Sequence, residues 1–170
     1  ELYSLAKENN VVFMEAVKTA YCPGFHAMMA AAKSGKIGRI IDVEAAFSRL
    51  TPVNTREYMA QDYNGSFLEF GSYVCMPVFE LLGCDYDDVR FHSMRAVNGV
   101  DAYTKAVFSF GGKSAEVKTG LGVKTEGQLL ISGTNGYILA KSPWWLTKEF
   151  EIRYEDPNKK EVYKYAYEGS

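Results

Sequence analysis

Residues 64–83, NGSFLEFGSYVCMPVFELLG, separate a first part of the chain, which has both helical and strand patterns, from a second part made of strand patterns. A turn signal, Asn64-Gly65, leads directly into this apolar helical pattern. Glu69 and Tyr73 are four residues apart in it and therefore share one helix face. A carboxylate and a phenol in one cleft can hold a substrate hydroxyl and move its proton. A core helix with a surface glutamate and an anchoring tyrosine is the more common arrangement, so the residues alone favour that alternative.

The sequence after Gly83 alternates short strand patterns with turn residues. Asn98-Gly99, Gly111-Gly112 and Asn135-Gly136 supply the turn chemistry. Because the connections between consecutive segments are short, we expect antiparallel pairing. The expected strands cover residues 89–97, 103–110, 114–123, 128–132, 137–140, 148–154 and 162–167.

The sequence before residue 64 predicts two helices and two strands. Residues 1–9 form a helical pattern, and the apolar run from Val11 to Ala16 has the size of a buried strand. A second helix is expected from Gly24 to Ser34, and a strand with one wetter face begins near Ile40. A long loop, residues 51–64, follows, and loops of this length are often functional. The predicted fold class is α+β, a large, mainly antiparallel β-sheet with helices on one face.

The bulk composition restricts the class of protein. A chain of 170 residues is one domain by length, and its net charge of −2 gives no electrostatic reason to expect nucleic acid or an anionic membrane. No apolar run approaches the ~20 residues that span a bilayer, and the first residues do not resemble a signal peptide. The three cysteines show no C-x-x-C spacing, so we expect free thiols and a cytoplasmic location. His26 and His92 lie far apart, and no metal site is expected.

Four segments, in order along the chain, resemble the Gfo/Idh/MocA family of nicotinamide-dependent oxidoreductases. They are FMEAVKTAYCP (13–23), KSGKIGRIIDVEAAF (33–47), the helix at 64–83 and ISGTNGYILAKSPWW (131–145). The helix is similar to the family pattern GG-x-L-x-D-x-G-x-[HY] through Gly65, Ser66, Leu68, Glu69, Gly71 and Tyr73. The nearest branch is the dihydrodiol dehydrogenase and glucose–fructose oxidoreductase branch, in which tyrosine replaces the more common histidine.

The resemblance implies roles for particular residues. Tyr73 and Glu69 would be the catalytic residues. Tyr73 would be the acid/base, assisted by a lysine from an E-K-P motif that would lie upstream of residue 1, and Glu69 takes the family's aspartate position. Lys18 and Arg56 are candidate substrate contacts, and Glu15 is a candidate cofactor contact. This chain departs from the pattern: Glu69 is one methylene longer than aspartate, Lys18 replaces an aromatic residue and Ala20 replaces an arginine.

The resemblance also implies a domain organisation. Residues 1–17 would be the remnant of a nucleotide-binding Rossmann domain, and residues 18–170 the C-terminal substrate-binding and oligomerisation domain. NAD or NADP would bind the intact parent, which would act on a sugar-like or trans-diol substrate, but we expect neither cofactor to bind this chain alone. The alternatives are a non-catalytic scaffold, used for oligomerisation, and a carbohydrate-binding module.

The chain is also expected to form a homo-oligomer through the outer face of its sheet. Trp144, Trp145 and many tyrosines fall on strand patterns and could form an exposed aromatic surface there. Ordinary core packing of these side chains is the alternative, and the sequence leaves it open.

Overall fold

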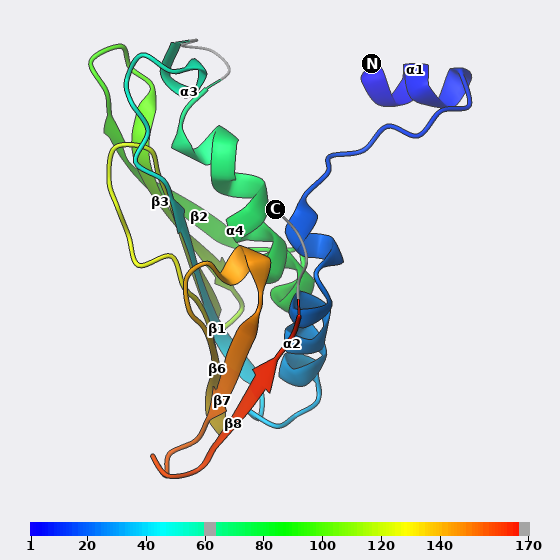
Figure 1. The fold of residues 1–170 in the computed structure, drawn as a ribbon, viewed down its shortest axis with the longest axis vertical. Helices are drawn as coiled ribbons and strands as arrows, with labels where there is room; N and C mark the ends of the chain where they lie inside the picture. The colour runs from blue at the N-terminus through cyan, green and yellow to red at the C-terminus, as the bar shows by residue number, and fades with distance from the viewer. Residues whose placement is uncertain (60–63, 167–170) are drawn as a thin grey trace.

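The computed structural model describes residues 1–59 and 64–166. Its centre is one eight-stranded sheet in the order β2-β3-β4-β1-β5-β6-β7-β8 (Figure 1). All neighbouring pairs are antiparallel except β1 and β4, which run parallel. The strands are β1 (Ile40–Ser48), β2 (Asp88–Arg95), β3 (Asp101–Phe110), β4 (Lys113–Gly120), β5 (Leu129–Gly133), β6 (Gly136–Ala140), β7 (Glu149–Arg153) and β8 (Lys160–Lys164).

The helices gather on one face of this sheet. α2 (Pro23–Lys33) and α4 (Ser66–Leu82) pack there together, whereas α1 (Leu2–Glu8) stands apart at the end of an extended segment (Figure 1). α3 (Arg56–Met59) is a short helix in the long loop before α4, and residues 60–63 of that loop lie outside the described residues. Two 3-10 helices, η1 (Lys18–Tyr21) and η2 (Trp144–Leu146), precede α2 and β7. The α+β class with helices on one face is confirmed.

The core fills the space between the sheet and the two long helices. In central strands such as β3 and β4, buried residues alternate with half-buried ones, so each of these strands gives one set of apolar side chains to the helices. In β1 these are Val43 and Ala45, which pack in one cluster with Val74 and Val78 of α4. Burial of each of these valine side chains contributes roughly 1.5–3 kcal/mol.

One expected strand does not form. Residues 11–16 are extended, but they are not assigned to a strand and their side chains are exposed. Val12 is 88% exposed and Val11 is 61% exposed. The described residues provide no neighbouring strand for this segment, and a strand needs one because its backbone groups must pair. The preceding helix is present as α1.

The prediction that the two tryptophans lie on the outer sheet face is wrong. Both belong to η2, and Trp144 is fully buried in the core, where its Nε1–H donates to the Ala46 carbonyl at 2.9 Å. Trp145 is half-buried and packs on Phe47, which belongs to the helix-covered side. The two tryptophans therefore pack in and against the core, which was the alternative that the sequence left open. An indole can be buried in this way once its N–H has an acceptor.

The remaining strand predictions agree with the structure within a few residues at each end. The last predicted strand, residues 162–167, corresponds to β8, and its final residue lies outside the described residues. No helix in the described part of the chain is long and apolar enough to span a membrane.

Candidate functional site

Tyr73 and Glu69 lie on α4 one turn apart, as their spacing predicts, but they have different surroundings. The Tyr73 ring stands edge-on to Phe47 of β1, with the ring centroids 5.3 Å apart, and is half-buried. Within residues 1–59 and 64–166, the Tyr73 hydroxyl has no hydrogen-bond partner. A half-buried phenol with an open hydroxyl can give a proton to a bound molecule or take one from it.

The wall beside Tyr73 is a stack of aromatic rings. Phe47 lies between Phe70 and Trp145, with centroid distances of 4.3 Å and 3.8 Å and nearly parallel planes. Three elements therefore meet at this end of the sheet: β1, α4 and η2. Such a wall excludes water from one side of Tyr73, which strengthens polar interactions made there.

Lys18 is brought to the same end of the sheet by η1. The hydroxyl of Thr19, the next residue, donates to the Trp145 carbonyl at 2.8 Å, and this bond ties η1 to η2. Thr19 itself is fully buried, whereas Lys18 is exposed. Glu15 lies three residues before Lys18, in the extended segment that precedes η1, and its side chain is exposed.

Glu69 is engaged by two arginines. Its carboxylate lies 3.4 Å from Arg56 of α3 and 3.9 Å from Arg49, which follows β1 directly. Arg49 also pairs with Glu57 at 3.0 Å and sits over the Phe70 ring, 5.7 Å from its centroid. Backbone and Thr55 hydrogen bonds, with the arginines, lower the pKa of Glu57. Arg56 and Glu69, both candidates from the sequence, therefore form an ion pair that joins the long loop to α4.

Arg49 was not identified from the sequence, although it is the cation that joins Glu57, Glu69 and Phe70. Its only signal in the sequence is its position immediately after the strand that ends at Ser48. The pairing depends on where α3 and α4 place their carboxylates, which the sequence alone does not give.

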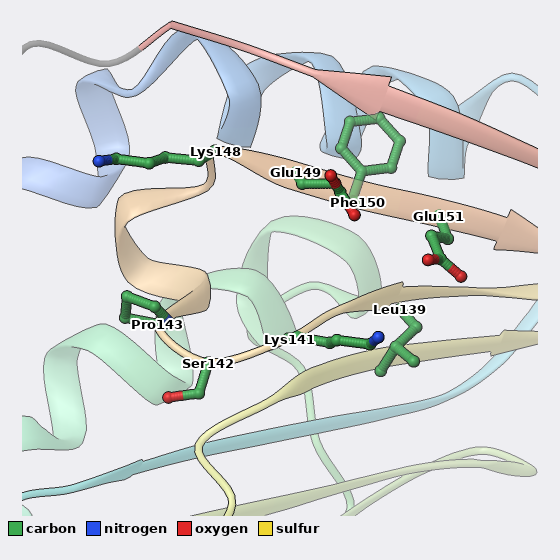
Figure 2. Close-up of a pocket in the computed structure, with 8 residues that line it drawn as sticks. All are labelled: Leu139, Lys141, Ser142, Pro143, Lys148, Glu149, Phe150 and Glu151. Atoms are coloured by element: carbon green, nitrogen blue, oxygen red, sulfur yellow. The ribbon is translucent and has the colours of Figure 1, made fainter.

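Two hollows of the structure are lined by residues other than Tyr73 and Glu69. The pocket in Figure 2 holds about 130 Å³ and is formed by the end of β6, the following loop and the start of β7. Sites for small molecules usually hold about 300–1,000 Å³, so this pocket is too small for a sugar. A hollow of about 660 Å³ lies between the tips of two hairpins, and its lining includes Tyr137, Tyr154 and Asp156. The Tyr154 hydroxyl already donates to Glu161, and Asp156 accepts from Asn158.

The triplet Gly120-Leu121-Gly122 does not lie at a strand-to-helix turn. It ends β4 and leads through an irregular segment to β5, with no helix N-terminus to receive a pyrophosphate. Leu121 is fully buried. No group of three or more metal-ligating side chains occurs in the described part of the chain.

A family model, the GFO/IDH/MocA C-terminal domain, matches residues 25–139. The chain belongs to this family. The Gfo/Idh/MocA chain is 28% identical over 166 residues to the scyllo-inositol 2-dehydrogenase (NADP+) of Bacillus subtilis, covering 92% of this chain and 49% of that protein. It is 24% identical over 159 residues to the trans-1,2-dihydrobenzene-1,2-diol dehydrogenase of Bos taurus, covering 91% of this chain and 47% of that protein.

Solved structures share the fold of this Gfo/Idh/MocA chain. A 3-ketoreductase from Actinomadura kijaniata, in complex with NADP and TDP-benzene, has a TM-score of 0.79 at 19% identity over 96% of this chain and 52% of that one. A levoglucosan dehydrogenase in complex with NADH and levoglucosan has a TM-score of 0.73 at 15% identity over 96% of this chain and 49% of that one. The chain therefore spans about half the length of the relatives it matches.

Proposed function

We propose that this chain is the substrate-binding domain of a NAD(P)-dependent oxidoreductase that acts on a sugar-like or trans-diol substrate, with Tyr73 as acid/base. The observation that carries the proposal is the open hydroxyl of Tyr73 beside the stack of Phe47 and Trp145, at the position where the family pattern has histidine or tyrosine. Two relatives, a scyllo-inositol dehydrogenase and a dihydrobenzenediol dehydrogenase, support the substrate class.

In this proposal the chain carries out the proton-transfer step of the reaction. Tyr73 takes the proton of the substrate hydroxyl during oxidation and returns it during reduction. When bound, NAD or NADP supplies the two-electron acceptor or donor. A nearby cation stabilises the deprotonated form of a phenol, and we assign that cation to the preceding domain.

The other candidate residues take supporting roles. Lys18, on η1 beside the aromatic wall, contacts the substrate. Glu69 and Arg56 act as a pair that holds the long loop against α4, so that the loop borders the substrate. Glu15, in the exposed segment before η1, faces the cofactor in the intact protein.

We propose residues 1–17 as the last part of a nucleotide-binding domain and residues 18–170 as the substrate-binding and oligomerisation domain. The exposed side chains Leu2, Leu5 and Phe13 of the first part support this division, because they offer apolar surface to a preceding domain. The chain alone then binds neither NAD nor NADP. Calorimetric titration with each cofactor tests this, and saturable micromolar binding would place the cofactor site within residues 1–170.

The decisive experiment is Tyr73→Phe in the longer protein that contains this domain. Phenylalanine keeps the ring packing on Phe47 but removes the proton, so kcat is expected to fall about 10²–10⁴-fold with cofactor affinity unchanged. Tyr86→Phe is the matched control, since Tyr86 is a partly exposed tyrosine in a different aromatic cluster with Phe79 and Phe108. A kcat within a few-fold of the unaltered enzyme would make Tyr73 a structural residue.

The alternatives predict different results in the same assays. A non-catalytic scaffold would show no turnover of any polyol or sugar in the longer protein. A carbohydrate-binding module would bind a sugar through residues 1–170 alone, and the hollow beside Tyr154 is the place to expect it. In that case Tyr154→Ala, and not Tyr73→Phe, would abolish the binding.

A further inference from the structure

The helix that carries Tyr73 and Glu69 begins without a capping side chain of its own. Its N-cap residue is Gly65, and the first turn of α4 receives no side-chain hydrogen bond from that position. The first N–H groups of a helix have no partner within the helix, and a buried helix end therefore needs partners from elsewhere. Ser66, the first helical residue, is fully buried, so water does not supply them.

Asp101, at the start of β3, supplies these partners from across the fold. One oxygen of its carboxylate, Oδ2, accepts the Phe67 N–H at 3.0 Å and the Ser66 hydroxyl at 2.6 Å. The same oxygen accepts the Thr104 hydroxyl at 2.8 Å. A carboxylate at a helix N-terminus is stabilised both by the N–H groups and by the helix dipole.

The Asp101 carboxylate leaves no room for a side chain at Gly65. Its φ of +124° lies in the region that favours glycine, and a Cβ there would stand 1.8 Å from the Asp101 Oδ1 atom. A larger residue at position 65 is therefore excluded twice, by its backbone angle and by Asp101. The glycine of the family motif and the distant aspartate belong to one arrangement.

The arrangement extends into the sheet. The Ser66 hydroxyl lies 2.9 Å from the hydroxyl of Thr119 in β4, and the Thr104 hydroxyl lies 2.8 Å from that of Ser93 in β2. Ser66, Thr104 and Thr119 are all buried. A buried network in which each member has a partner has few alternative geometries, so it fixes the start of α4 relative to three strands.

We propose that Asp101 is a positioning residue that fixes the start of α4 and, through the helix, the placement of Tyr73 against the substrate. This rests on the proposed function of Tyr73. Asp101 contacts the first two residues of α4, Ser66 and Phe67, and acts on Tyr73 through the helix. Its removal therefore loosens the first turn of α4 and lowers kcat with little effect on KM.

The first test measures amide hydrogen exchange of residues 67–69 in residues 1–170. Asp101→Ala is expected to speed exchange of the Phe67 amide roughly tenfold, the usual scale for loss of a cap. Asp101→Asn keeps one acceptor oxygen and nearly the same volume, and it is expected to give a smaller increase. Asp88→Asn, on an exposed aspartate paired with Arg90, is the matched control and leaves α4 unchanged. Unchanged exchange in Asp101→Ala would overturn the proposal.

The second test measures kcat and KM in the longer protein, at a temperature where every variant is fully folded. A fall in kcat of about tenfold, with KM within about twofold, supports positioning, because a small misplacement of a catalytic group acts mainly on kcat. Faster exchange with unchanged kcat would overturn it and leave Asp101 a stability residue only. If Tyr73→Phe keeps full turnover, the proposed function is wrong, while the exchange result still decides whether Asp101 fixes α4.

Discussion

The helix-covered face of the sheet and its open face differ in what their side chains contact. On the covered face, apolar residues such as Val43 and Ile131 are fully buried against α2, α4 and η2. On the open face, charged residues pair within and between strands. Glu116 of β4 pairs with Lys105 of β3 at 2.5 Å and with Lys118 of its own strand at 2.7 Å. The candidate site and the Asp101 network both belong to the covered face. Apolar burial there supplies stability, and the few polar groups among it are fixed in place.

The largest effect is expected from the covered face. Trp144→Ala removes a fully buried indole and leaves a cavity, so the free energy of unfolding should fall by about 3–5 kcal/mol. Trp144→Phe is the matched variant, because it keeps a six-membered aromatic ring while it loses the pyrrole part of the indole and its bond to the Ala46 carbonyl. Urea unfolding of residues 1–170 measures both. A loss below about 1 kcal/mol in Trp144→Ala would mean that the core closes around the gap.

A second prediction tests whether the open face is an interface. Leu130 and Leu139 are paired across β5 and β6 on that face, and we propose that it joins two copies of the chain. Changing either leucine to lysine puts a charge into such an interface, so the dissociation constant of the dimer should rise about a hundredfold. Light scattering gives the solution mass, with Lys113→Glu at a strand end as the control. A monomer before any change would refute the interface.

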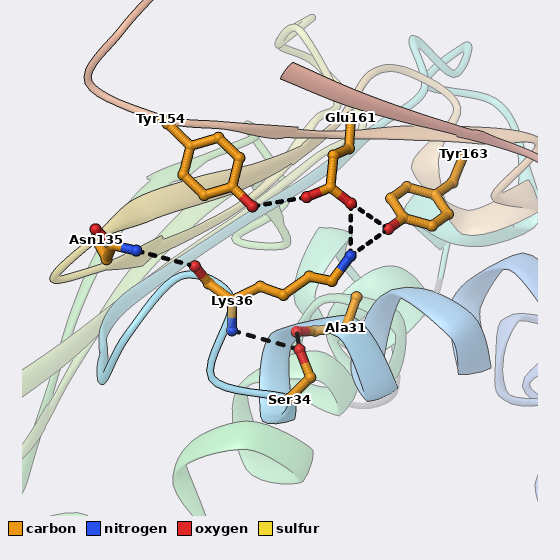
Figure 3. Close-up of polar contacts among 7 residues, drawn as sticks. All are labelled: Ala31, Ser34, Lys36, Asn135, Tyr154, Glu161 and Tyr163. Atoms are coloured by element: carbon orange, nitrogen blue, oxygen red, sulfur yellow. Dashed lines mark hydrogen bonds and ion pairs between the residues drawn. The ribbon is translucent and has the colours of Figure 1, made fainter. Parts of the chain in front are cut away.

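A third prediction concerns a clasp at the edge of the sheet, where Lys36 meets β8 (Figure 3). Glu161 accepts from Lys36 at 2.5 Å and from the hydroxyls of Tyr163 and Tyr154 at 2.5 Å and 2.7 Å. These bonds lower the pKa of Glu161 to about 2 and raise that of Lys36. Because the carboxyl pKa is depressed in the folded state, its contribution is present above the ordinary value near 4.5 and is lost as pH falls toward about 2.

The measurement is the melting temperature between pH 5 and pH 2. Glu161→Gln should remove part of the acid dependence, with only a small change at neutral pH, because the clasp is partly exposed and screened by water. Glu155→Gln, on an exposed glutamate of the neighbouring turn, is the control. Parallel profiles for the original chain and Glu161→Gln would show that the clasp does not couple stability to pH.

The smallest effect is expected from the ion pairs of the open face. Burial opposes ionisation of Glu116, but hydrogen bonds from Lys105 and Lys118 outweigh it and lower its pKa. Glu116→Gln should cost no more than about 1 kcal/mol, and the cost should shrink further in high salt. Urea unfolding at low and high ionic strength measures it. A cost comparable to that of Trp144→Ala would remove the difference between the two faces.

Local patterns in the sequence were sufficient to predict most helices and strands and the α+β fold class. The alternation of β1 and the turn pairs between later strands predicted the strands, and the apolar pattern after Asn64-Gly65 predicted α4 with Tyr73 and Glu69 on one face. The reason is that periodicity and turn chemistry act over a few residues. The family motifs, each short and local, were recognisable for the same reason, and the match over residues 25–139 confirmed the family.

Contacts between distant segments were decided by the tertiary structure alone. The insertion of β1 between β4 and β5, the burial of Trp144, the Arg49–Glu69 contact and the hold of Asp101 on α4 join residues that are 20 or more positions apart. Val11 to Ala16 has the composition of a strand but no strand beside it in the described residues. Pairing and burial depend on the neighbour that the fold provides, and a residue's own sequence context does not specify that neighbour.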